Sequence, residues 1–105
     1  MNSFNFTEMF KLRDLLKEAN IPFRMREIHD GLQIIYPDVE IEDAECDAAL
    51  HGFSYGHELG LLEIMGLLTD DEEENDSVLG NLTAEEVYNR IKAHFDSLSF
   101  SPESK

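Results

Sequence analysis

The chain has 105 residues, of which 42% are apolar and 10% aromatic, and its formal net charge is −15. That apolar content predicts a folded domain, because a disordered chain combines high net charge with low hydrophobicity. Eighteen acidic residues and no lysine or arginine lie between residues 27 and 89. Such a charge argues against direct binding to nucleic acid or to a membrane surface, and it favours a protein partner with a basic surface.

The length predicts one domain over residues 1–105, with frayed ends over 1–6 and 99–105. Cys46 is the one cysteine in the sequence, which excludes an internal disulfide. The first residues lack the basic and then apolar pattern of a signal peptide, so we expect a cytoplasmic protein. The longest apolar stretch, residues 59–68, has about half the length that a membrane-spanning helix needs.

Residues 7–19 have the spacing of an amphipathic helix. Thr7 is the predicted N-cap, and Asn20 and Pro22 end the segment, because Asn tolerates left-handed backbone and the residue before a proline prefers extended geometry. Apolar residues recur at spacings of three and four, and the inward face they form consists of Met9, Leu12, Leu15, Leu16 and Ala19.

Asp30 and Gly31 predict the two-residue loop of a β-hairpin with a type I′ turn. This register would place His29 opposite Leu32, Glu27 opposite Ile34 and Met25 opposite Tyr36. Alternation along the two strands then predicts one apolar face and one polar face. The apolar face consists of Phe23, Met25, Leu32, Ile34 and Tyr36, and the other face carries Arg24, Arg26 and Gln33.

Residues 38–50 are compatible with two structures. Apolar residues alternate in one phase before Glu42 and in the other phase after Asp43, so a third strand with a bulge near these two residues would explain the pattern. The competing interpretation is a short helix, whose inward residues would be Ile41, Ala44, Ala48 and Ala49.

Residues 59–68 are apolar almost all round a helix, which predicts a short, buried central helix after a turn-rich passage with three glycines. Glu63 is the exception in this segment. A carboxylate there needs a partner such as a backbone amide or Arg24, or it lies at an interface.

Residues 70–76 contain six carboxylates and predict a solvated loop, because they cannot be buried without partners. The run does not have the spacing of a calcium-binding loop. Asn75 stands where glycine should make the sharp turn, and Asn81 stands where a bidentate glutamate should complete the shell.

Residues 83–95 predict a helix that begins with a capping box formed by Thr83 and Glu86. Leu82 and Val87 would form a hydrophobic staple at its start. The inward stripe of this helix would consist of Val87, Ile91, Phe95 and Leu98. Together the elements predict an α+β fold: a small antiparallel β-meander, made of the hairpin and a third strand, packed against N-terminal, short central and C-terminal helices.

The glycine-rich passage contains the one candidate catalytic cluster, which consists of Ser54, Tyr55, His57 and Glu58. The glycine spacing is not that of a phosphate-binding loop, and the serine does not stand on a Gly-x-Ser-x-Gly elbow. A tight structural connection therefore explains these residues better than catalysis does. Cys46, His51, His57 and Glu58 lack the close spacing of zinc ligands, so we expect no metal and no cofactor.

Two segments carry a resemblance to other proteins: residues 61–69 (Leu-Leu-Glu-Ile-Met-Gly-Leu-Leu-Thr) and residues 82–87 (Leu-Thr-Ala-Glu-Glu-Val). They resemble segments of short acidic proteins of Gram-positive bacteria and their prophages. The resemblance covers the C-terminal half and implies an origin in a mobile element. Those proteins have no assigned activity, so the resemblance transfers no role to any residue.

We therefore expect a non-enzymatic accessory or interaction protein that docks through an acidic surface on a basic protein partner. An exposed apolar patch near the acidic surface would serve the same partner or a second copy in a homodimer. One alternative is a DNA-mimic inhibitor of a nucleic-acid-binding enzyme, and another is a small hydrolase or metal-dependent enzyme at the candidate catalytic cluster. The expected binding residues are Asp38, Glu40, Glu42, Asp43, Glu45, Asp47, Asp70, Asp71, Glu72, Glu73, Glu74 and Asp76.

Overall fold

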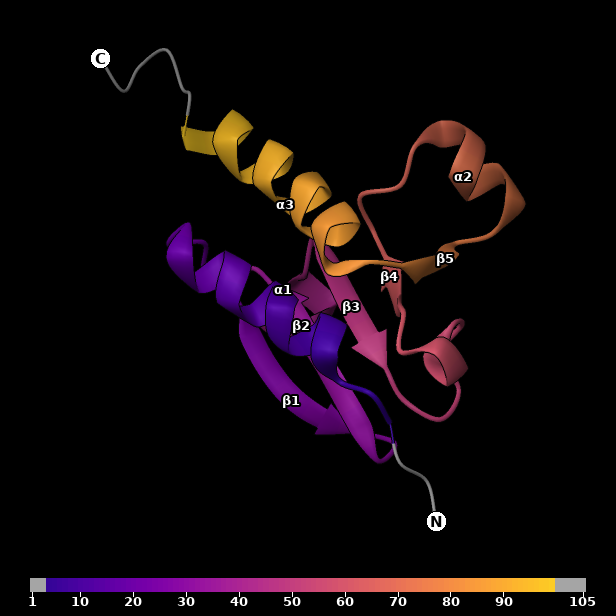
Figure 1. Ribbon diagram of the computed structural model, residues 1–105. Coiled ribbons are helices and arrows are strands. Elements are labelled where there is room, and N and C mark those ends of the chain that lie inside the picture. Colours follow the sequence, from indigo (N-terminus) through magenta and orange to yellow (C-terminus); the bar gives the residue numbers. More distant parts are fainter. Residues whose placement is uncertain (1–3, 100–105) are drawn as a thin grey trace.

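The computed structural model describes residues 4–99, and over this range it has five strands in one antiparallel sheet and three α-helices (Figure 1). The predicted α+β class is confirmed. The elements are α1 (Thr7–Glu18), β1 (Arg24–Ile28), β2 (Gly31–Tyr36), the 3₁₀ turn η1 (Ile41–Asp43), β3 (Cys46–Leu50), the 3₁₀ turn η2 (His57–Leu59), β4 (Leu62–Met65), α2 (Asp70–Asn75), β5 (Val78–Leu82) and α3 (Ala84–Ser99). The strands lie side by side in sequence order, so the meander has two strands more than predicted.

The N-terminal helix forms as predicted, and Met9, Leu12 and Leu16 on its inward face are buried. Its start is corrected: Phe6 occupies the N-cap position, and Thr7 is the first helical residue. The predicted frayed ends include residues 1–3 and 100–105, which lie outside the described part of the chain. Within the described part, Phe4 and Phe6 pack against the hydrophobic core.

The hairpin has the predicted turn type but a different register. Its loop consists of His29 and Asp30, with φ angles of 50° and 63°, as a type I′ turn requires. Gly31 is instead the first residue of β2, where a Cβ atom would lie 2.0 Å from the carbonyl oxygen of Leu50. The glycine is therefore needed for the close approach of β3 and not for the turn. The predicted pairing is wrong by two residues, since Met25 pairs with Ile34, but a two-residue shift keeps every side chain on its predicted face.

The segment after the hairpin is a strand only in its second half. Residues 41–43 form the turn η1 where the prediction had a bulge, and β3 begins at Cys46. Cys46, Ala48 and Leu50 point into the core, as the third-strand interpretation expected. The competing helical interpretation of the whole segment is wrong.

The predicted central helix is wrong, because residues 62–65 form strand β4 in the interior of the sheet. Leu62 and Ile64 are fully buried against the helices, whereas Glu63 and Met65 point to the opposite face. A short apolar run has no periodicity that separates a buried strand from a buried helix. Gly60 and Gly66, with φ angles of 72° and 89°, bound the strand at both ends.

The predicted solvated loop at residues 70–76 is also corrected, since residues 70–75 form the helix α2, although none of its residues is buried. Thr69 caps this helix: its Oγ1 accepts a hydrogen bond from the Glu72 amide, and the Glu72 carboxylate accepts one from the Thr69 amide. Carboxylates in the first turn of a helix are stabilised by the unpaired amides there. Acidic composition and helical structure are therefore compatible here.

The C-terminal helix and its capping box are confirmed, with the Glu86 amide 3.3 Å from Thr83 Oγ1 and the Thr83 amide 2.8 Å from Glu86 Oε1. Val87 and Ile91 are buried as predicted. Leu98 is not part of the inward stripe, because the helix extends past the sheet and this side chain is 59% exposed.

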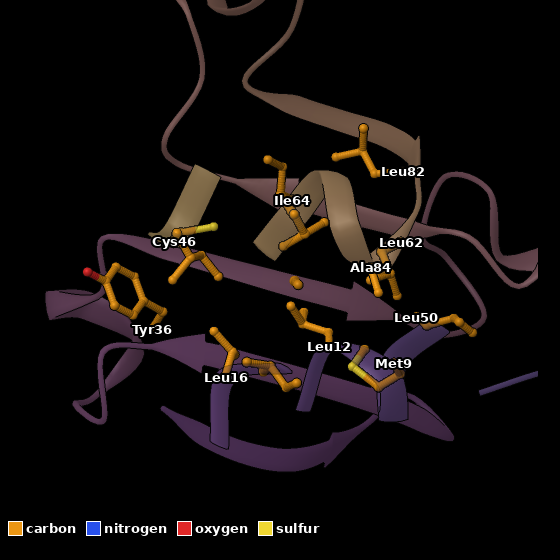
Figure 2. Close-up of a cluster of buried hydrophobic side chains, with 14 of the residues drawn as sticks. Met9, Leu12, Leu16, Tyr36, Cys46, Leu50, Leu62, Ile64, Leu82 and Ala84 are labelled. Atoms are coloured by element: carbon orange, nitrogen blue, oxygen red, sulfur yellow. The ribbon is translucent and has the colours of Figure 1, made fainter. Parts of the chain in front are cut away.

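Helices α1 and α3 lie side by side on one face of the sheet (Figure 1). The hydrophobic core fills the space between them and the sheet, with side chains of α1 meeting those of β2, β3 and β4 (Figure 2). The two helices are also joined at their N-terminal ends, because Glu8 Oε1 accepts a hydrogen bond of 2.7 Å from the Ala84 amide. Among residues 4–99, no helix has the length and apolar character needed to cross a membrane.

Candidate functional site

The predicted binding residues belong to two acidic segments, 38–47 and 70–76, which meet at one cavity of about 280 Å³ that we call the acidic cavity. The segment before and within β3 forms one side, and Glu73 of α2 and Ser77, two residues after the end of that helix, form the other. The lining residues are Ile41, Ala44, Glu45, Cys46, Asp47, Met65, Gly66, Glu73 and Ser77. Carboxylates from both segments thus face one space.

The sheet register places the two segments together. Asp47 on β3 pairs with Met65 on β4, and the chain turns immediately afterwards at Gly66. A Cβ atom on Gly66 would lie 2.2 Å from the carbonyl oxygen of Glu45, so the chain can pass this close only with glycine at that position. The turn directs the following residues, including Glu73, back toward the start of β3.

Asp47 is the half-buried carboxylate of the acidic cavity. Its Oδ2 accepts a 2.6 Å hydrogen bond from Gln33 Nε2, and Gln33 Oε1 in turn accepts one of 2.6 Å from Arg26 Nε. Burial raises the pKa of Asp47, while the hydrogen bond from Gln33 and the charge of Arg26 act in the opposite direction. The net upward direction means that the carboxylate remains under-compensated, so a cation in the cavity would stabilise its charged form.

Glu45 and Glu73 are exposed at the opening of the acidic cavity. Met65, which is 49% exposed, and Ile41 contribute apolar surface beside these carboxylates. Lysine and arginine side chains combine an apolar stem with a charged head group, and they bury the stem on apolar surface. The cavity therefore has the chemistry that suits a basic side chain of a partner.

Three of the other predicted carboxylates bind arginines of the chain itself. Asp38 and Glu40 lie 2.9 Å and 3.1 Å from Arg24, and Glu72 binds Arg90. Six more are exposed without lining the acidic cavity: Glu42, Asp43, Asp70, Asp71, Glu74 and Asp76. Of the twelve predicted binding residues, the cavity brings together Glu45, Asp47 and Glu73.

Sequence reasoning missed the residues that hold the surroundings of the cavity in place. Glu45 Oε1 lies 3.6 Å from His94 Nε2, and His94 Nδ1 lies 2.7 Å from the hydroxyl of Tyr36. Tyr36 and His94 are 58 residues apart, and no local pattern connects a strand residue with a residue of a distant helix. Arg90 could have been noticed, because it is the first basic residue after the acidic span.

The candidate catalytic residues do not form a nucleophile and base pair. Ser54 is buried, and its Oγ bonds the backbone amide and carbonyl of His51 at 2.9 Å and 3.0 Å. His57 Nδ1 bonds the carbonyl oxygen of Ser54 at 2.6 Å instead of its hydroxyl. The Tyr55 side chain is 53% exposed, and Glu58 Oε1 lies 4.0 Å from His57. These contacts stabilise the conformation of the loop between β3 and β4.

The candidate metal ligands are also separated. Cys46 is the first residue of β3 and His51 follows its last residue, so the two lie about 16 Å apart by the usual rise per strand residue. Within residues 4–99, no group of three or more His, Cys, Asp or Glu side chains is arranged to hold a metal ion. Burial raises the pKa of the Cys46 thiol to about 12, so it remains protonated as part of the core.

Glu63 has the kind of partner that the sequence predicted, although it stands on a strand and not on a helix. Its Oε1 accepts a hydrogen bond of 2.7 Å from the Tyr55 amide. Burial raises the pKa of Glu63, and the Tyr55 amide partly opposes this effect. The contact ties the loop between β3 and β4 to the sheet.

Comparison with known proteins adds no identification, since no protein-family model, curated protein or solved structure matches the chain.

Proposed function

We propose that this protein is a non-enzymatic accessory protein that docks on the basic surface of a protein partner, with an arginine or lysine of that partner in the acidic cavity. The observation that carries the proposal is the convergence of Glu45, Asp47 and Glu73, from two separate segments, on one cavity with an apolar wall. Charge complementarity accelerates such an encounter and selects the partner. The apolar stem of the basic residue would pack against Met65.

Docking on a protein is better supported than mimicry of DNA. A mimic needs an uninterrupted row of carboxylates that replace phosphates. In this chain Asp38, Glu40 and Glu72 are held by Arg24 and Arg90, so three carboxylates of the two acidic segments are already neutralised. Three carboxylates gather around one space at the acidic cavity, as recognition of one or two basic side chains requires, while six others of these segments are exposed outside it.

A labelled peptide of alternating arginine and alanine tests the proposal by fluorescence anisotropy. The triple variant Glu45→Gln, Asp47→Asn, Glu73→Gln should weaken binding about tenfold, because three partly exposed ion pairs contribute about 0.2–1 kcal/mol each. The same peptide with citrulline in place of arginine should bind neither protein, because citrulline keeps the shape of arginine without its charge. Binding of the arginine peptide should fall as salt rises.

A matched control variant separates the contribution of the acidic cavity to peptide binding from the contribution of the overall net charge. The triple variant Asp14→Asn, Glu18→Gln, Asp30→Asn removes the same charge from exposed residues outside the cavity. It should bind the arginine peptide within about twofold of the unaltered chain, since long-range effects on exposed sites are screened. Equal loss of affinity in both triple variants would show that net charge alone attracts the peptide, and the proposal would then be abandoned.

A further inference from the structure

The loop between β3 and β4, residues 51–60, is held closed by contacts of His51. Its backbone amide and carbonyl bond Ser54 Oγ, as described above, and its carbonyl also accepts a hydrogen bond of 3.1 Å from the Ser54 amide. The ring makes a further contact, because Nδ1 accepts a hydrogen bond of 3.0 Å from the Phe53 amide. The His51 residue is 9% exposed, so its ring has little access to water.

The hydrogen bond to Nδ1 requires a neutral imidazole. A ring nitrogen accepts a hydrogen bond only when it carries no proton, so His51 must hold its one proton on Nε2. The imidazolium form has a proton on both nitrogens and no acceptor. Protonation of His51 would therefore direct the new N–H at the N–H of Phe53, and the contact that closes the loop would be lost.

The groups around His51 act mostly against its protonation. The ring of His29, on the hairpin loop, lies edge-on at 5.0 Å between ring centroids, and Phe53 contacts both rings. Burial lowers the pKa of His51, and the charges of His29 and of His57 on η2 lower it further, whereas Asp47 on β3 raises it. The surroundings of the closed loop thus favour the neutral form of His51.

We propose that His51 makes the loop of residues 51–60 an acid-sensitive element, which opens when its imidazole takes up a proton. A lowered pKa in the closed form means that the open form binds the proton more tightly. The closed form is therefore fully favoured above the ordinary pKa of histidine, about 6.5, and loses stability as the pH falls through that value. Opening would move three exposed apolar side chains, Phe53, Tyr55 and Leu59, which are 76%, 53% and 72% exposed.

Amide hydrogen exchange of the full chain, followed by NMR between pH 7.5 and pH 5, tests this proposal. The protection factors of the Phe53 and Ser54 amides should fall by up to about tenfold per pH unit below about pH 6, the dependence expected for uptake of one proton. The amides of Leu62 and Ile64 on β4 serve as internal controls and should keep their protection. Unchanged protection of Phe53 and Ser54 over this range would overturn the proposal.

The variant His51→Asn provides the sharper comparison, because its Oδ1 can replace Nδ1 as an acceptor and does not titrate. It should keep the Phe53 amide protected at both ends of the pH range. The control variant His94→Asn removes an imidazole outside the loop and should respond to acid like the unaltered chain. If His51→Asn fails to fold, the ¹⁵N shifts of the His51 ring decide, since a proton on Nδ1 at pH 7.5 would also overturn the proposal.

Discussion

Arg90 on α3 binds Glu72 on α2 through two parallel hydrogen bonds, from Nη1 to Oε1 at 2.9 Å and from Nη2 to Oε2 at 2.7 Å. Arg90 Nη1 also donates to the carbonyl oxygen of Leu67 at 3.0 Å. Helix α2 has no buried residue, so this forked contact holds one wall of the acidic cavity relative to the rest of the fold.

The substitution Arg90→Lys should loosen α2 without unfolding the domain. Lysine keeps the charge but cannot make two parallel hydrogen bonds with one carboxylate. We expect amide exchange in residues 70–75 to accelerate about tenfold, while exchange in β2 and β3 remains unchanged. The control variant Lys92→Arg alters an exposed cation on the same helix and should leave α2 unaffected. If amide exchange in residues 70–75 is the same in the Arg90→Lys variant as in the unaltered chain, then other contacts hold α2 in place.

The contact between Arg90 and Glu72 should also depend on pH in a defined window. Hydrogen bonds from Arg90 lower the pKa of Glu72 from 4.5 to about 2. A lowered pKa means that the stability contributed by this contact is fully present above pH 4.5 and is lost as the pH falls through about 2. A ¹³C NMR titration of the Glu72 carboxyl measures this directly. In the variant Arg90→Gln the pKa should return toward 4.5, and an unchanged value there would contradict the assigned cause.

Strand β4 can be tested by replacing two adjacent residues. Ile64 is fully buried and Met65 is 49% exposed, because successive strand residues point to opposite faces. The variant Ile64→Ala should lower the free energy of unfolding by about 2–5 kcal/mol, and Met65→Ala by less than about 0.5 kcal/mol. Chemical denaturation of both variants gives these values. Similar losses of unfolding free energy at the two positions would contradict the assignment of β4 as a strand.

The two capping boxes should differ in what they stabilise. The variant Thr83→Ala should lower the free energy of global unfolding by about 1 kcal/mol, because α3 is part of the core. Thr69→Ala removes the same type of cap from α2, which buries no residue. It should accelerate amide exchange in residues 70–75 while the midpoint of global unfolding stays the same. A comparable change of midpoint in both variants would mean that α2 unfolds together with the sheet.

The sequence predicted the elements whose signals are local. The periodic helix after Phe6, the capping box at Thr83 and the inward phase of Cys46, Ala48 and Leu50 depend on neighbouring residues, and all three were confirmed. The capping box of α2 has the same signal, with Thr69 three residues before Glu72, but the charge density of residues 70–76 favoured the prediction of a loop. For residues 70–75, the helix-capping signal therefore predicts the structure correctly, whereas the charge density does not.

The structural predictions were wrong where contacts between segments distant in the sequence determine the structure. Gly31 is required by the approach of Leu50, which no hairpin pattern contains. Residues 62–65 became a strand because β3 and β5 supply hydrogen-bonding partners on both sides. The acidic cavity depends on the pairing of Asp47 with Met65 and on the turn at Gly66, so its three carboxylates could be proposed individually but not as a group.

The packing of α1 against α3 places the first helix beside the last one. Each strand finds its neighbour next in the chain, so the sheet can assemble progressively from local contacts as the polypeptide is made. Met9, Leu12 and Leu16 can meet Val87 and Ile91 only after the last element has been synthesised. During translation, part of the apolar face of α1 therefore stays uncovered until α3 has left the ribosome, and uncovered apolar surface favours aggregation.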